Sequence, residues 1–99
     1  MLNSKQRAQL RSIASQTDAI FQIGKGGIGD AMCKSLTDAL EARELIKISV
    51  LENAAESARD FADQVAEATA SEVVAVIGRK IVLYKKAEKP EHQKISAQL

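Results

Sequence analysis

Residues 19–30 read AIFQIGKGGIGD, and this stretch decides the fold. Its first five residues are mostly apolar and stop at a glycine, which predicts a short strand over Ala19–Ile23. Gly24–Gly29 holds four of the chain's five glycines and must therefore be a loop. Asp30 then opens a helix to about Glu44, and an acid in a first helical turn suits the helix dipole. The stretch thus reads as a strand, a glycine-rich loop and a helix in direct succession.

The loop Gly24-Lys25-Gly26-Gly27 has the chemistry of an anion site. Glycine adopts positive φ at no steric cost and lets a ligand approach the backbone closely. Successive amide N–H groups can converge on an anion, and the N-terminus of the following helix adds a partial positive charge. Lys25 adds a full charge at the tip of the loop. Loops of the GxxG type bind nucleic-acid backbone in this way, so we predict that this loop holds phosphate.

Two other interpretations of the loop stay open. The pattern Gly24-x-Gly26-x-x-Gly29 matches a dinucleotide-binding fingerprint, and Glu52 follows near the position of the ribose-binding acid. Only one such loop is present, and no plausible catalytic group accompanies it, so this interpretation is the least favoured. The remaining interpretation is a turn that only reverses the chain.

The segments on either side of the loop predict the rest of an α/β (α+β) fold. Leu45–Leu51 alternates apolar and polar residues, as in a half-buried strand, and Gly78-Arg79 suits a type II′ hairpin turn. The other predicted elements are a helix from Asn3 or Ser4 to about Ser15, a helix over Ala54–Ala70, and strands over Val73–Ile77 and Lys80–Lys85. The order α-β-α-β-α-β-β predicts a four-stranded mixed sheet with helices packed against it.

Charge is distributed unevenly along a chain whose net charge is only +1. Residues 1–34 carry five bases and two acids, residues 52–72 six acids and one base, and residues 73–99 six bases and two acids. This pattern predicts a polarised surface with one side that attracts anions. The acids of the third helix should face away from phosphate; they are Glu56, Asp60, Asp63 and Glu67. Candidates for a wider basic surface around the loop are Lys5, Arg7, Arg11, Lys34, Arg79 and Lys80, with Lys47, Lys85 and Lys86 ranked behind them.

The composition argues against several other classes of protein. No apolar run approaches the roughly 20 residues of a membrane span, and the start of the chain lacks the apolar stretch of a signal peptide. Cys33 and His92 are the only residues of their types, so we expect no disulfide, no metal site and no cofactor, in a reduced cytoplasmic setting. The three aromatic residues are too few for a base-stacking platform, so binding should use phosphate and shape.

The chain also resembles a known family, the CRM (chloroplast RNA splicing and ribosome maturation) domain in its stand-alone bacterial YhbY-like form. The resemblance covers about residues 2–86 and rests on four motifs in the right order. They are residues 2–7 (LNSKQR), 23–28 (IGKGGI), 44–48 (ELIKI) and 76–84 (VIGRKIVLY). Residues 1–86 would then form the RNA-binding domain, and residues 87–99, with Pro90, a frayed C-terminal tail.

The resemblance implies more than the residues alone do. It implies a fold like the C-terminal domain of a bacterial translation initiation factor. It implies RNA binding through the GxxG loop, no catalytic activity, and association with precursors of the large ribosomal subunit. One residue departs from the family pattern: Gly29 stands where Thr or Ser usually caps the next helix. A protein-interaction module that leaves RNA alone is the alternative function, and the oligomeric state stays open.

Overall fold

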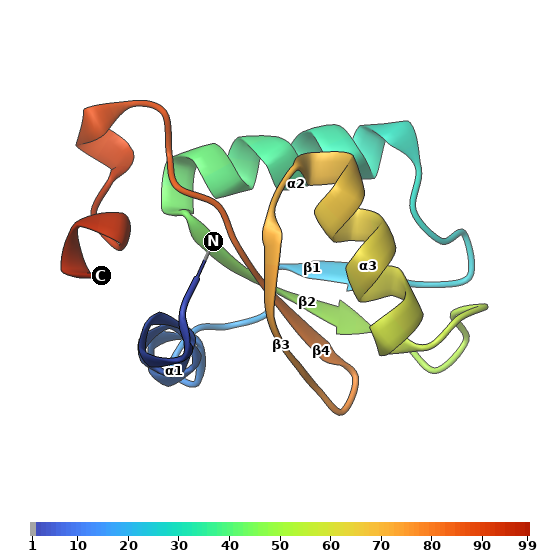
Figure 1. The fold of residues 1–99 in the computed structure, drawn as a ribbon. Helices are drawn as coiled ribbons and strands as arrows, with labels where there is room; N and C mark the ends of the chain where they lie inside the picture. Colours follow the sequence, from blue (N-terminus) through green and yellow to red (C-terminus); the bar gives the residue numbers. More distant parts are fainter. Residues whose placement is uncertain (1) are drawn as a thin grey trace.

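The computed structural model describes residues 2–99 and contains the predicted order of helices and strands (Figure 1). The elements are α1 (Ser4–Ala14), β1 (Phe21–Ile23), α2 (Asp30–Arg43), β2 (Leu45–Val50), α3 (Ala58–Thr69), β3 (Glu72–Ile77), β4 (Lys80–Tyr84) and the 3-10 helices η1 (Pro90–His92) and η2 (Ser96–Gln98). The predicted α+β class and the four-stranded mixed sheet are confirmed.

The sheet brings three loops to one edge. Its strand order is β1-β2-β4-β3, with β1 parallel to β2 and the other two pairs antiparallel. β1, β2 and β3 therefore run in the same direction and end at the same edge. The glycine-rich loop and the hairpin turn lie at the two sides of this edge, because β1 and β3 are the outer strands, and residues 51–57 lie between them. In Figure 1 the first two of these loops along the chain are at the right and the hairpin turn is at the bottom. We call this edge the loop end.

Both faces of the sheet are covered, but by different helices. α2 and α3 lie on one face, where the largest core cluster includes Phe61, Ile48 and Leu83. α1 crosses the other face, where Leu10 packs with Leu45 and Val82. β2 was expected to expose its polar side to solvent, but the α1 side of β2 is covered as well. Lys47 is half-buried there, and its Nζ donates to the carbonyl oxygens of Ala14 (3.2 Å) and Thr17 (3.4 Å) at the end of α1.

The ends of the helices follow from their caps. Asn3 and Gln6 form a reciprocal capping box at the start of α1. Each side chain accepts the backbone N–H of the other residue, so two N–H groups that have no partner within the helix are satisfied. α3 begins at Ala58 rather than at the predicted Ala54, because the Ser57 side chain accepts the N–H of Asp60 (3.2 Å). In the hairpin, Gly78 has φ +58° and Arg79 does not share the positive φ, as a type II′ turn requires.

The C-terminal segment differs from the frayed tail that its polar composition led us to expect. Ala87 is buried, and residues 87–96 are held at the end of α2 by two carboxylates. Glu44 accepts the N–H groups of Ala87 (2.8 Å), Ile95 (3.0 Å) and Ser96 (2.8 Å). Glu41 accepts the N–H of Glu88 (2.7 Å) and pairs with His92 Nδ1 (2.9 Å), so the single histidine of the chain is held against α2.

Candidate nucleic-acid interface

The glycine-rich loop folds as a tight turn at the end of β1. The Gly27 N–H donates to the Gly24 carbonyl oxygen (3.0 Å), which makes Lys25 and Gly26 the central residues. Neither central residue has positive φ, whereas Gly27 has φ +66°, as suits a type I turn with glycine at its fourth position. Lys25 and Gly26 are both exposed. The turn therefore presents the lysine and the adjoining backbone to solvent.

The space around the glycines leaves the loop open to a ligand. A Cβ at Gly26, Gly27 or Gly29 would meet no atom within 4 Å. At Gly24 a Cβ would lie 3.4 Å from Leu51 Cδ1, because the Leu51 N–H donates to the Ile23 carbonyl (2.8 Å) and ties residues 51–57 to the end of β1. A ligand can thus reach the Gly26–Gly27 backbone from outside the molecule.

Two helices begin at the loop end, and each brings the partial positive charge of its N-terminus to that end of the sheet. α2 starts at Asp30 after Gly29, whose extended backbone (φ −106°, ψ 173°) offers no side-chain cap to the first amides. The first turn of α2 therefore keeps N–H groups free of side-chain hydrogen bonds. α3 starts at Ala58. The Asp30 carboxylate, exposed in the first turn of α2, offsets part of this positive potential.

The hairpin brings two of the predicted basic residues to the same edge. The Val50 N–H donates to the Arg79 carbonyl (2.7 Å), which fastens the turn to the end of β2. Arg79 lies 4.0 Å from the Glu52 carboxylate, and Lys80 Nζ donates to Ser49 Oγ (3.0 Å). The Arg79–Glu52 pair is more than half exposed on both sides, so solvent screens it and either partner can exchange for a ligand.

Lys34 lies just over one turn into α2. Its Nζ is 3.3 Å from the Asp38 carboxylate, and both side chains are largely exposed, so this pair is also weak. A cavity of about 280 Å³ opens between residues 51–58 and the hairpin turn, with Arg79 on its wall. Glu52 and Glu56 line the same cavity, so its charge is mixed.

The basic residues of α1 divide between two sides of the helix. Arg7 Nη1 donates to the Val73 carbonyl (2.6 Å) at the start of β3, so Arg7 is half-buried and contributes to the fold. Arg11 follows one turn later on the same side and is exposed. At about 100° per residue, Lys5 lies on the opposite side of α1 from Arg7. The structure thus separates Lys5 from the two arginines.

The acidic residues of α3 lie on the other layer of the molecule. Asp60, Asp63 and Glu67 are exposed on the solvent side of α3, which covers the face of the sheet opposite α1. Glu56 precedes the helix and accepts a hydrogen bond from Gln64 Nε2 (2.9 Å). The four acids therefore share a layer with α2 and α3 and not with the arginines of α1.

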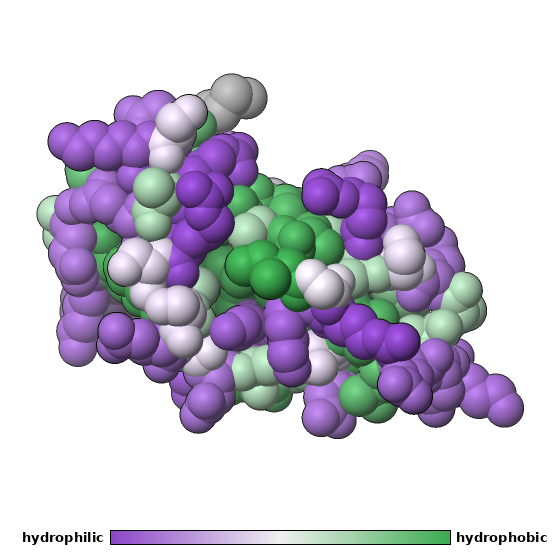
Figure 2. Space-filling model, turned by 90° about the horizontal axis from the view of Figure 1, so that it is seen from below, coloured by the Kyte–Doolittle hydropathy of each residue, from purple (hydrophilic) through white to green (hydrophobic). Residues whose placement is uncertain are grey.

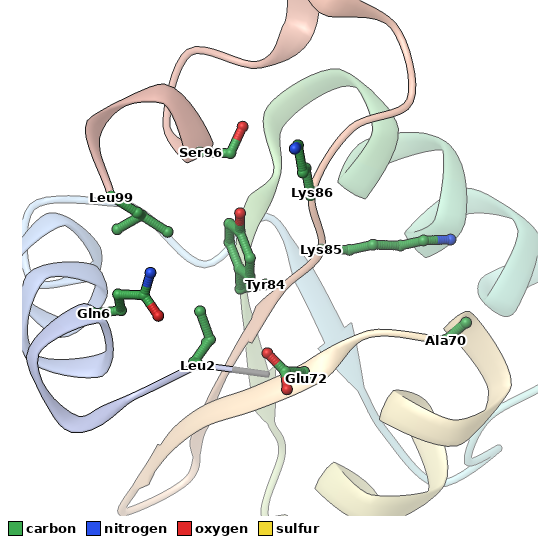
Figure 3. Close-up of a pocket in the computed structure, with 9 residues that line it drawn as sticks. All are labelled: Leu2, Gln6, Ala70, Glu72, Tyr84, Lys85, Lys86, Ser96 and Leu99. Carbon is green, nitrogen blue, oxygen red and sulfur yellow. The ribbon is translucent and has the colours of Figure 1, made fainter.

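A second hollow lies at the far end of the sheet from the loop (Figure 3). It has a volume of about 400 Å³, and the Tyr84 hydroxyl points toward Ser96 beside it. Burial raises the pKa of Tyr84 above its ordinary value of 10.0, and the Glu44 and Glu72 carboxylates add to this effect. The nearby Glu44 is fully buried, although the sequence marked it only as the first residue of the motif 44–48. Its isolated place between a helix and a strand gave no signal of burial.

Two further observations concern the described residues. Within residues 2–99 no three His, Cys, Asp or Glu side chains come together as metal ligands. None of the helices in that range is both long and apolar enough to cross a bilayer.

The fold and the site define a class of protein: a small α+β domain that presents a glycine turn and two helix N-termini at one edge of its sheet. The sequence profile of the CRS1 / YhbY (CRM) domain matches residues 2–85. The chain belongs to this family, as its motifs indicated.

Individual relatives agree with this membership. The Bacillus subtilis protein named probable RNA-binding protein YqeI is 49% identical over 88 residues, which cover 89% of this chain and 92% of that protein. A Methanocaldococcus jannaschii protein, also named a probable RNA-binding protein, is 32% identical over 88% of this chain and 66% of its own length. A solution structure of a Staphylococcus aureus protein, described as a candidate RNA binder, superimposes with a TM-score of 0.76 at 49% identity. It covers 91% of this chain and 94% of that one.

Proposed function

We propose that this chain is a non-catalytic RNA-binding protein that holds backbone phosphate in the loop Gly24-Lys25-Gly26-Gly27. The observation that carries the proposal is the open turn, which exposes Lys25 and the Gly26–Gly27 backbone beside a helix N-terminus without a side-chain cap. Amide N–H groups and a helix dipole favour an anion without reading a base. The family and the relatives named as RNA-binding proteins support RNA as the source of that anion.

The wider surface would add phosphate contacts around the loop. Arg79 and Lys80 lie at the same sheet edge, and Lys34 lies about one turn into α2. Arg11 extends the positive surface along α1, whereas Arg7 is already hydrogen-bonded to the fold and contributes mainly its charge. Lys5 lies on the other side of α1, so it would reach only an RNA that wraps around the helix.

We further propose that the RNA belongs to precursors of the large ribosomal subunit, in the cytoplasm. The family resemblance supports this, and co-sedimentation of the protein with ribosomal particles in a sucrose gradient tests it. Sedimentation with particles that precede the mature large subunit is the expected result. A protein that stays at the top of the gradient under all salt conditions would refute the assembly role.

The loop is tested by comparing two substitutions that act differently. Lys25→Ala removes one charge and leaves the backbone intact, so it should lower the magnitude of the slope of log K against log salt by about 0.7–0.9. Gly26→Asp places a carboxylate in the anion site and should weaken binding more severely. A Cβ fits at Gly26 without collision and its φ is not positive, so this variant should keep its fold.

Circular dichroism of both variants comes before the RNA titrations. Lys89→Ala, an exposed lysine of the C-terminal segment, serves as the matched charge control. A folded Gly26→Asp protein that binds RNA as tightly as the parent would show that the loop is only a turn. The least favoured alternative is that the loop binds a dinucleotide cofactor such as NAD. Calorimetric titration of the protein with NAD tests it, and a measurable heat of binding would contradict our proposal.

A further inference from the structure

One part of the sheet is not covered by any helix. The strand registers place Gln22, Ser49, Lys80 and Ile77 in a row across β1, β2, β4 and β3, on the face that α1 covers farther along. Ile77 is 60% exposed, one of the three large apolar side chains exposed among residues 2–99. Figure 2 views the molecule from this side and shows apolar surface in the middle, bordered by hydrophilic side chains. We call these four residues the open row.

The open row adjoins the proposed phosphate site. Gln22 lies two residues before Gly24, and Ile77 and Lys80 flank the hairpin turn at the same sheet edge. Four neighbouring strands span three inter-strand spacings, so the row is about 14 Å long. A nucleic-acid strand that leaves the loop along the sheet would therefore meet these side chains first.

Basic side chains are the only charged ones in the two rows of this face nearest the loop end. Neither the open row nor the next row of the sheet toward α1, which contains Lys47, Val82 and Ala75, includes an acid. Gln6 and Leu2 face the hollow beside the C-terminal segment, and Gln9 Nε2 bonds the Gln98 carbonyl (3.4 Å). The opposite side of α1, which carries Arg7 and Arg11, therefore faces the open row. Arg7 is held at the Val73 carbonyl near the start of β3, Arg11 follows one turn later on α1, and Lys80 stands within the open row, held by Ser49 Oγ at 3.0 Å.

We propose that the open row binds unpaired bases of the RNA whose phosphate the loop holds. The inference rests on the proposed function and names the form of RNA, single-stranded, that the site accepts. Ile77 offers an apolar surface to a base face, and the Gln22 amide offers a donor and an acceptor to a base edge. Lys80 and Arg11 neutralise the flanking phosphates.

Aliphatic contact replaces stacking at this surface. Phe61 and Tyr84 are buried, and Phe21 packs against the core on the other face of the sheet. A protein partner fits less well, because the exposed isoleucines of this face, Ile77 on β3 and Ile20 just before β1, are separated by the width of the sheet and offer little continuous apolar area to bury. A second copy of this chain would bring the same positive charges face to face.

The test compares Ile77→Ser and Lys80→Ala on two RNAs, an unstructured oligouridine and a perfect duplex of the same length. Base contact requires unpaired bases, whereas phosphate contact does not. Ile77→Ser should weaken oligouridine binding about fivefold, as expected for losing part of one apolar side chain's burial, and leave duplex binding unchanged. Lys80→Ala should weaken both RNAs and reduce the salt slope for both. Lys89→Ala is the charge control, and circular dichroism confirms that each variant folds.

The outcomes separate this inference from the proposed function. If Lys25→Ala weakens RNA binding but Ile77→Ser leaves oligouridine affinity unchanged, the loop site stands and the open row is refuted. Equal weakening of oligouridine and duplex by Ile77→Ser would also refute base contact. If neither Lys25→Ala nor Ile77→Ser changes the affinity for either RNA, both proposals fail together.

Discussion

Replacing the buried Glu44 by glutamine tests how the C-terminal segment is held. The carboxylate accepts N–H groups from Ala87, Ile95 and Ser96 at 2.8–3.0 Å. Glutamine keeps one acceptor oxygen and turns the other into an NH₂ group that faces an N–H donor. At least one charge-assisted hydrogen bond is lost, and a buried donor stays unpaired. We expect Glu44→Gln to lower the free energy of unfolding by about 2–4 kcal/mol.

The same carboxylate makes stability depend on pH. Burial alone would raise the pKa of Glu44, but the N–H donors of Ser96, Ala87 and Ile95 outweigh it and hold the pKa below the ordinary 4.5. Because the folded pKa is the lower one, the stabilisation is complete above pH 4.5 and is lost as pH falls through the folded pKa. Glu44→Gln should remove this part of the acid sensitivity.

Two measurements check the effect at Glu44. Urea denaturation followed by circular dichroism gives the free energy of unfolding. Limited trypsin digestion reports release of the segment, which carries Lys89 and Lys94 as cleavage sites. Glu91→Gln makes the same chemical change at an exposed position of the segment and is the control. If Glu44→Gln unfolds at the urea concentration of the parent and is cut no faster, the carboxylate does not hold the segment and our interpretation is wrong.

Three further substitutions have expected outcomes. Phe61→Ala empties the centre of the main core, where Phe61 is 2% exposed, and should cost about 3–5 kcal/mol, visible as a fall in Tm of at least about 12 °C. Gly29→Ser should stabilise α2 by about 0.5–1 kcal/mol in urea denaturation, because the backbone there is already extended and serine adds a cap. Replacing Asp60 and Asp63 together by serine should cost at most about 1 kcal/mol, since Asp60 lies in the first turn of α3. The affinity for RNA should then rise slightly or stay the same, and a large fall would reveal a role for this side of α3.

The order and type of the elements could be predicted from local patterns. The glycine cluster marked the loop, and alternation of apolar residues marked β2, because both signals arise from neighbours in the sequence. The start of α3 was misplaced by four residues because the apolar periodicity continues upstream of Ser57. The helix itself begins only after Ser57, which is its N-cap. Periodicity says which side of a helix is buried, but the hydrogen bond of the cap decides where the helix begins.

The packing of residues 87–99 could not be predicted because its partners are distant in sequence. Glu44 lies 43 residues from Ala87 and 52 from Ser96. A polar segment with one proline resembles a frayed tail as long as its backbone N–H groups have no known acceptor. The left-handed backbone of Glu44 (φ 66°) at the end of α2 directs the chain into β2, and the buried carboxylate supplies the acceptors that the segment lacks.

The candidate site divides in the same way between local and distant information. The glycine turn needs only four consecutive residues, so the sequence contains the whole of it. The open row combines residues from four strands, and its existence depends on a helix crossing only part of the sheet face. A count of basic residues treats Lys5 and Arg7 alike. Because they are two residues apart in a helix, however, their side chains lie on opposite sides of it. Ile77 shows the same limit, because the continuous apolar run Val73–Ile77 assigns it to a buried strand, while the absence of α1 above the hairpin leaves it 60% exposed. The open row therefore needs information that is distant in the sequence: the strand register that aligns its four residues, and a covering helix that ends short of the loop end.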